Sequence, residues 1–429
     1  MNVYKNPNKR EWRALTERPK MEKEELSKLV SKILNDVKKN QDQALLQYGK
    51  KFDNVKLEQL GVSDLEIAKA QSLVSYPLKA AIEIAKQNIE KFHASQKMEE
   101  QLIETTKGVE CWRKSVGIEK VGLYIPGGTA PLFSTILMLG IPAKLAECRE
   151  IILCTPPNQD GEINPAILYT ANLIGINQIY KVGGAQAIAA MVYGTETIPQ
   201  VYKIFGPGNQ FVTKAKELIQ QDGIAIDMPA GPSEVLVIAD ETANPAFIAA
   251  DLLSQAEHGA DSQVILLSNS ESIINQSLTE VEKQLAQLPR KEIAMQALKN
   301  SKSILLNNMD DCIDFSNLYA PEHLIIASEN ASNYSDKIIN AGSVFLGNYS
   351  CESAGDYASG TNHTLPTNGF AKNYSGVSLD SFQKKISFQK LSKEGLKNIG
   401  PAIEIMAEAE ELFGHKNAVS IRLKNIDNV

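Results

Sequence analysis

The sequence predicts an α/β protein with two parallel-sheet domains, a helical N-terminal region and a small helical and extended C-terminal domain. The first observation is a series of nine short, apolar segments at 121–125, 150–154, 178–182, 201–205, 234–239, 263–267, 303–306, 323–327 and 343–346. Short apolar strands separated by helix-length gaps are typical of parallel sheets buried on both faces. The second observation is the number of these strands. Because nine strands are many for one sheet, we expect two Rossmann-like domains.

The third observation is the helical pattern of the first hundred residues. Apolar residues recur at helical spacing from residue 21 to 48, and a second helical stretch runs from about 63 to 96. Pro77 is expected to divide this second stretch into two helices. The region contains no motif that suggests chemistry, so we expect it to be a packing layer.

These patterns divide the chain into four predicted parts. Residues 1–20 form an N-terminal arm, and residues 21–123 together with 235–378 form an α/β domain with the helical layer and the catalytic residues. Residues 124–234 form an inserted α/β domain that contains glycine-rich loops. Residues 379–429 form a C-terminal domain with a helix and a strand-like end at 418–422.

Composition and charge exclude several classes of protein. The 429 residues include 51 acidic and 44 basic side chains, and the net charge of −7 argues against a surface for nucleic acid or anionic membranes. Five cysteines stand without a CxxC pair, which disfavours a disulfide framework and a cysteine-based zinc finger. The polar N-terminus and the absence of a long apolar run predict a soluble, cytoplasmic protein with no membrane partner.

Three glycine-rich turns follow predicted strands, at 126–129, 183–186 and 206–209. Glycine lets a backbone approach a ligand closely, and the helix after each turn offers its N-terminus to phosphate. No turn completes the GxGxxG pattern, because Phe211 stands where the third turn would need its last glycine. Each turn alone could be a tight strand-to-helix connection. The three together favour a nucleotide site without identifying the nucleotide.

His258 closes a predicted helix that begins at Asn244 and Pro245 and stops at Gly259. Gln255 and His258 stand at i and i+3, so both side chains project from one face of the last turn. The pair could share one metal ion. The alternative is that His258 only complements the helix dipole.

Glu322 and His323 stand side by side just after Pro321, at the start of a predicted strand. Loops at strand ends are where α/β domains place catalytic groups. An adjacent glutamate and histidine can act as acid and base within one site. On spacing alone, a surface pair is an equally good interpretation.

Two further segments contain candidate polar residues. Asp356 and His363 lie in the polar, glycine-rich stretch 351–367, and long structured loops are often functional. His415 ends a predicted C-terminal helix, and Glu410 lies on the flank of its apolar side, where a carboxylate needs a partner. If the segments converge, four side chains form a ligand set that suits zinc or a similar divalent ion: Gln255, His258, Asp356 and His415.

From about residue 109 to 423 the chain contains a series of long motifs: GLYIPGGTAPL from 122, VGGAQA from 182, FGPGNQFV from 205, IDMPAGPSE from 226, DLLSQAEHG from 251, YAPEHL from 319 and SGTNHTLPT from 359. In content and order these motifs resemble the histidinol dehydrogenase family, and the resemblance has several implications. It implies an enzyme of the last steps of histidine biosynthesis. Such an enzyme oxidises L-histidinol to L-histidine with two NAD molecules, through an aldehyde that stays bound.

The resemblance also implies a role for each candidate residue. One zinc per site would be held by Gln255, His258, Asp356 and His415, and NAD would contact Tyr124, Gln186 and Asn209. The substrate would contact the four zinc ligands together with Ser233, His323, His363 and Glu410. His323 would be the general base and Glu322 its partner in hydrating the aldehyde. The family forms homodimers, in which the C-terminal segment, with Glu410 and His415, would serve the neighbouring chain's site.

The residues themselves leave other functions open. One is a zinc hydrolase in which Glu322 and His323 activate water and the glycine turns are only structural. Another is a nucleotide-binding protein without catalysis. Aldehyde oxidation through a cysteine adduct is a rival mechanism, but Cys111 and Cys154 lack a basic neighbour, so we expect both to be dispensable.

Overall fold

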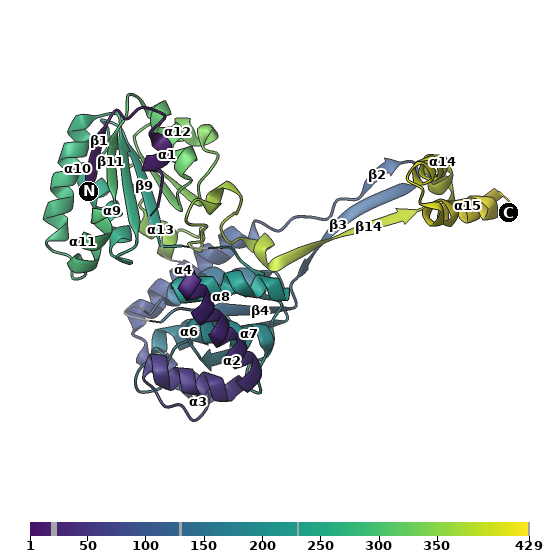
Figure 1. The fold of residues 1–429 in the computed structure, drawn as a ribbon, viewed down its shortest axis with the longest axis horizontal. Helices are drawn as coiled ribbons and strands as arrows, with labels where there is room; N and C mark the ends of the chain where they lie inside the picture. Colours follow the sequence, from purple (N-terminus) through teal and green to yellow (C-terminus); the bar gives the residue numbers. More distant parts are fainter. Residues whose placement is uncertain (19–23, 128–130, 230, 428–429) are drawn as a thin grey trace.

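The computed structural model describes residues 1–18, 24–127, 131–229 and 231–427. Over these residues the chain forms two sheet domains and a long antiparallel arm that ends in two helices (Figure 1). Both domain sheets are parallel, which confirms the predicted α/β class. All nine predicted strands are present, with small shifts at their ends.

The first domain is built on a five-stranded parallel sheet. Its strands lie in the order β6 (Gln178–Lys181), β5 (Glu150–Thr155), β4 (Lys120–Tyr124), β7 (Lys203–Phe205) and β8 (Ala225–Ile226). Helices α5 (Phe133–Leu145), α6 (Pro165–Leu173), α7 (Gly184–Tyr193) and α8 (Gln210–Ile219) connect them. The predicted glycine turns follow β4, β6 and β7, so their described residues, 126–127, 183–186 and 206–209, lie at the carboxyl edge of this sheet. Residues 128 and 129 of the first turn lie outside the described part of the chain.

The second domain is built on a six-stranded parallel sheet. Its order is β1 (Asn2–Lys5), β11 (Lys302–Leu305), β10 (Gln263–Ser268), β9 (Glu234–Ala239), β12 (His323–Ala327) and β13 (Ser343–Leu346). Helices α9 (Pro245–Ala256), α10 (Glu271–Leu285) and α11 (Lys291–Lys299) pack on one face. The short α1 (Trp12–Leu15) and α12 (Met309–Tyr319) pack on the other. The predicted N-terminal arm therefore contributes an edge strand and a helix to this domain.

The N-terminal helical layer packs on the domain of the five-stranded sheet, whereas the sequence analysis grouped it with the domain of residues 235–378. Helices α2 (Glu24–Tyr48), α3 (Asp64–Leu73) and α4 (Tyr76–Ala94) pack against α7, α6 and α5 of the first domain. The apolar stripe of α2 joins the same core cluster as Tyr124 and Ile188. Grouping residues 21–123 with residues 235–378 therefore does not describe this packing. Helical periodicity shows which face of a helix is buried but not which partner covers it.

Pro77 divides the second helical stretch as expected, since it stands in the first turn of α4 after the N-cap Ser75. The side chain of Ser75 accepts the backbone N–H of Leu78. Among the described residues, no helix is both long and apolar enough to cross a membrane.

The arm joins residues that are far apart in the sequence. Strand β3 (Val109–Gly117) pairs antiparallel with β14 (Gln383–Leu391) along its whole length and with β2 (Ile103–Thr106) at one end. Helices α14 (Lys393–Ala409) and α15 (Phe413–Asp427) form a hairpin at the far end of this arm (Figure 1). The strand-like end predicted at 418–422 is wrong, because these residues lie within α15. Its packing against α14, where Leu423 meets Gly400, outweighs the β-branched composition.

Candidate active site

The candidate catalytic residues gather at the amino edge of the six-stranded sheet. Glu234 begins β9, His323 begins the neighbouring strand β12, and Gln255 lies in the last turn of α9. The location differs from the carboxyl edge that open α/β sheets usually use for ligands. The backbone groups at the amino ends of these strands bond to side chains from other elements, and these contacts build the site.

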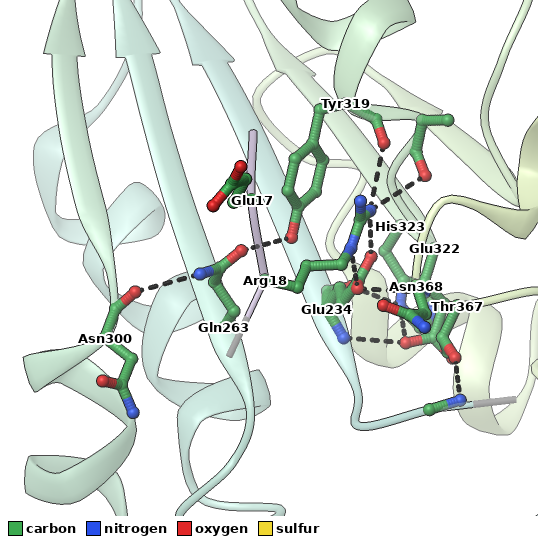
Figure 2. A network of polar contacts seen from close by, with 12 residues as sticks. Glu17, Arg18, Glu234, Gln263, Asn300, Tyr319, Glu322, His323, Thr367 and Asn368 are labelled. Carbon is green, nitrogen blue, oxygen red and sulfur yellow. Dashed lines mark hydrogen bonds and ion pairs between the residues drawn. The ribbon is translucent and has the colours of Figure 1, made fainter. Parts of the chain in front are cut away.

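Glu322 and His323 form a buried pair, which rules out the surface interpretation. Only 6% of Glu322 and 3% of His323 are exposed. Oε2 of Glu322 accepts a hydrogen bond from the backbone N–H of Glu234 at 2.8 Å and lies 3.6 Å from Nδ1 of His323 (Figure 2). Burial is the main cause that raises the pKa of the Glu322 carboxyl.

The two ring nitrogens of His323 have different surroundings. Nδ1 lies 3.2 Å from the backbone oxygen of Glu234 and 3.0 Å from Nε2 of Gln255. Nε2 is buried, has no hydrogen-bond partner among the residues that the structure describes, and lies 3.6 Å from Oδ1 of Asp356. With Nδ1 held in place, Nε2 is the nitrogen available to a ligand. Burial lowers the pKa of His323, but nearby carboxylates, Glu322 foremost, outweigh it and raise the pKa overall.

A cluster suited to a cation lies beside His323. Ligand atoms of His258, Glu352 and Asp356 all lie within 4.8 Å of one another. Within the described part of the chain, the buried Oε2 of Glu352 and Oδ1 of Asp356 have no hydrogen-bond partner. Unpaired buried carboxylate oxygens are costly, and a divalent ion with nitrogen and oxygen ligands would satisfy them. The residues present therefore fit a zinc-like ion.

Glu352 is a site residue that the sequence analysis missed. It lies one turn before Asp356 on the short helix α13 (Glu352–Tyr357), so both carboxylates share one helix face. This i, i+4 spacing was visible in the sequence. The polar, glycine-rich composition of 351–367 nevertheless favours a loop over a helix, so the sequence does not single out Glu352.

Gln255 is fully buried, and its Nε2 donates to the backbone oxygen of Glu234 at 3.2 Å. His258 lies just beyond the end of α9, where its backbone N–H bonds the carbonyl of Gln255 at 3.3 Å. The predicted cap of α9 is confirmed, since the side chain of Asn244 accepts the N–H of Ala246. In the single chain the His258 side chain is exposed, unlike Gln255.

His363 connects the two domains. Its Nδ1 lies 2.9 Å from the backbone oxygen of Asp356, and its Nε2 lies 3.1 Å from Oγ1 of Thr135 on α5. Because α5 begins at the carboxyl edge of the five-stranded sheet, this contact brings that edge opposite the cation cluster. Ser233 directly precedes β9 and Glu234, and its backbone oxygen accepts the N–H of Gln263 at 3.2 Å.

The three predicted dinucleotide contacts line one cavity of about 780 Å³ in the first domain: Tyr124, Gln186 and Asn209. This volume lies within the usual range for small-molecule sites. The cavity is bordered by Gly127 and Gly184, from two of the glycine turns. A Cβ on Gly127 would lie 2.1 Å from Cγ of Pro156, so only glycine fits.

Side chains also order the turns around this cavity. The hydroxyl oxygen of Tyr124 accepts the N–H of Gly184 at 3.0 Å, where α7 begins. Oδ1 of Asn209 caps α8 by accepting the N–H groups of Phe211 and Val212 at 3.0 and 3.2 Å. Two helix N-termini thus start at the cavity, an arrangement that favours phosphate groups.

Glu410 and His415 do not join the site within one chain. Glu410 is the C-cap of α14, and His415 lies in the first turn of α15 instead of ending the preceding helix as predicted. Both helices lie at the tip of the arm, away from the two sheet domains (Figure 1). The single chain therefore brings together Gln255, His258 and Asp356 but leaves the fourth predicted zinc ligand distant.

The fold and site define a nucleotide-dependent enzyme, with a glycine-bordered cavity in one domain and a buried Glu–His pair beside a cation cluster in the other. Comparison with known proteins narrows this class. The sequence profile of the histidinol dehydrogenase family matches residues 16–423, so the chain belongs to this family and is an NAD-dependent oxidoreductase.

Individual relatives match over almost their whole length. Histidinol dehydrogenase from Bacteroides thetaiotaomicron is 59% identical over 99% of this chain and 100% of the relative. The enzyme from Campylobacter jejuni is 50% identical over 99% of both chains. The crystal structure of histidinol dehydrogenase from Elizabethkingia anophelis superposes with a TM-score of 0.98 at 65% identity, covering 100% of this chain and 99% of that one.

Proposed function

We propose that the protein is a zinc-dependent L-histidinol dehydrogenase that carries out two successive NAD-dependent oxidations, through L-histidinal to L-histidine. The observation that carries the proposal is the buried Glu322–His323 pair, which lies beside the cluster of His258, Glu352 and Asp356. The glycine-bordered cavity across the domain boundary is the proposed NAD site.

The proposed zinc ligands are Gln255, His258 and Asp356, with His415 from a second chain. When bound, the zinc ion would anchor the imidazole and amine nitrogens of histidinol. Glu352 adds a second carboxylate to this cluster. Ser233, His363 and Glu410 are proposed to contact the substrate beside these ligands.

In the first oxidation, Nε2 of His323 takes the hydroxyl proton of histidinol while hydride leaves its carbon for NAD. This step gives the aldehyde and NADH. The hydrogen-bonded Nδ1 keeps the ring oriented, so that Nε2 faces the substrate. A positioned base of this kind typically contributes about 10²- to 10⁴-fold to such a step.

The second oxidation first requires water to add to the aldehyde carbon. Glu322, as a carboxylate, is proposed to orient this water and take one of its protons, while the protonated His323 returns its proton to the aldehyde oxygen, which gives the hydrated aldehyde. Hydride then leaves the hydrated carbon for a second NAD as His323 accepts the hydroxyl proton, which yields the carboxylic acid. The bond from Glu234 N–H to Glu322 holds the carboxyl in position.

A homodimer with shared active sites is part of the proposal. Glu410 and His415 lie at the end of the arm, where several large apolar side chains are exposed: Ile405, Met406, Phe413 and Ile421. These side chains belong to the hairpin of α14 and α15, and exposed apolar groups gathered in this way are typical of a surface that another chain covers. The partner's arm would then supply the two residues that a single chain lacks.

The proposal is tested by following NADH absorbance with L-histidinol and NAD, with metal analysis of the same sample. EDTA is expected to abolish NADH formation, and added zinc is expected to restore it. Without zinc, the imidazole and amine nitrogens of histidinol would lose the ion that anchors them. Activity unchanged after verified metal removal would contradict the metal assignment. A zinc hydrolase, the alternative function, would form no NADH and would give the cavity of Tyr124 and Gln186 no role.

Cys154 is expected to be dispensable for both oxidations. It is fully buried at the end of β5, and burial raises the pKa of its thiol well above the usual value. A nucleophilic cysteine needs a lowered pKa and access to the substrate, and this thiol has neither. Cys154→Ala should therefore keep kcat within about twofold. Loss of turnover in a folded variant would favour a covalent thiol mechanism over the water mechanism.

A further inference from the structure

The side chain of Glu234 is held by an arginine from the N-terminal segment. Nε of Arg18 donates to Oε1 of Glu234 at 2.5 Å, and Nη2 donates to Oε2 at 2.8 Å (Figure 2). The backbone N–H of Asn368 also bonds Oε1, at 3.0 Å. The pair is buried, with 14% of the Arg18 side chain and 3% of the Glu234 side chain exposed.

Arg18 is itself fixed by a second element. Its Nη2 donates to the backbone oxygen of Tyr319 at 3.0 Å, and its guanidinium carbon lies 3.9 Å from the centre of the Tyr319 ring. Arginine can make this planar, two-pronged contact with a carboxylate while stacking on an aromatic ring, which lysine cannot. The geometry therefore specifies an arginine at this position.

The backbone of Glu234 contacts three of the proposed site residues. Its N–H donates to Glu322, and its carbonyl oxygen accepts from Nε2 of Gln255 and lies 3.2 Å from Nδ1 of His323. Glu234 thus contacts Arg18 through its side chain, and Glu322 and His323 through its backbone (Figure 2). Its backbone oxygen also binds Gln255, a proposed zinc ligand.

We propose that Arg18 is a positioning residue, which orients Glu322, His323 and Gln255 by clamping Glu234. The inference rests on the proposed function and extends the site to the N-terminal segment. That segment is anchored independently by β1, which pairs with β11, and by Trp12, which packs on Phe315. Without Arg18, the buried carboxylate of Glu234 loses its countercharge, and the backbone that holds the site is expected to shift.

The test compares Arg18→Gln, Arg18→Lys and Lys9→Gln in the full-length protein. Lys9 is the matched control, because it joins the same segment to α12 through Asp311 and Asp314 without touching Glu234. Circular dichroism checks the fold of each variant. Zinc affinity is measured by competition with a chromophoric chelator, and kcat and KM for histidinol are measured separately.

Arg18→Gln is expected to lower kcat and zinc affinity by about 10- to 100-fold each, since outer contacts of metal sites have effects of this size. Arg18→Lys should recover part of both losses because it restores the charge but not the two-pronged contact. Lys9→Gln should match the wild type. If Arg18→Gln does not fold, kcat and zinc affinity are compared between Arg18→Lys and Lys9→Gln. Lower values in Arg18→Lys alone would support the proposal, and equal values would contradict it.

Wild-type kcat and zinc affinity in a folded Arg18 variant would overturn this inference and leave the proposed function intact. A wild-type protein that forms no NADH from histidinol would overturn the proposed function instead. The ratio of zinc affinities between Arg18→Gln and the wild type would still decide whether Arg18 orients the site.

Discussion

Glu322→Gln is expected to slow the oxidation of the aldehyde by about 10²- to 10⁴-fold while affecting the oxidation of the alcohol much less. The amide keeps the shape of the side chain, and its oxygen can still accept the N–H of Glu234. It cannot take a proton from water. Because burial already raises the pKa of Glu322, a neutral side chain should be tolerated and the variant should fold.

The measurement is a single-turnover experiment with enzyme in excess over histidinol. The wild type should form two NADH per histidinol in close succession, whereas Glu322→Gln should form the first promptly and the second slowly. Glu280→Gln is a suitable control, since Glu280 forms an ion pair with Lys283 on the same helix, α10, and touches none of the proposed site residues. Equal slowing of both phases would show that Glu322 does not act specifically in hydration.

Mixing Glu322→Gln chains with His415→Ala chains is expected to restore histidine formation that neither variant supports alone. If the arm of each chain completes its partner's site, a mixed dimer contains one site with both residues intact and one site with both defects. Random pairing in a twofold dimer then predicts roughly a quarter of the wild-type activity. If each chain formed its own complete site, no mixed dimer would have an intact one.

A second mixture provides the control for this experiment. Glu322→Gln and His258→Ala alter residues that belong to the same sheet domain, so each site of their mixed dimer retains one defect. This mixture should stay inactive even when mass spectrometry confirms exchange of chains. Recovery in the control, or its absence in the first mixture after confirmed exchange, would contradict sharing of Glu410 and His415 across the dimer.

Patterns of neighbouring residues predicted much of this fold, because the burial of short apolar runs, helix capping and the conformational freedom of glycine depend on residues close together in the sequence. The nine strands were found from their apolar runs, and the start of α9 from the capping residue Asn244 followed by Pro245. The glycine turns were found from residue type alone, since Gly127 leaves no room for a Cβ. Strand β1 was missed because Val3 is 47% exposed at the sheet edge, so the segment lacks a buried apolar run.

The features that the sequence did not predict depend on contacts between segments far apart in the chain. The apolar face of α2 would fit either domain equally well in the sequence, and only packing against α7 decided its place. The β3–β14 arm pairs residues more than 260 positions apart, so no local signal marks it. Likewise, the contact from Arg18 to Glu234 spans 216 positions.

By itself, the sequence determined the α/β class, nine strands of the two parallel sheets, the glycine turns and the residue types from which the site is built, because these follow from local spacing and composition. Only the tertiary structure decided that Glu322 and His323 are buried, that Glu352 faces the cation cluster, and that the arm carries His415 away from its own chain's site. The reason is physical: burial and the convergence of charges depend on which distant segments pack together, and that is a property of the folded chain.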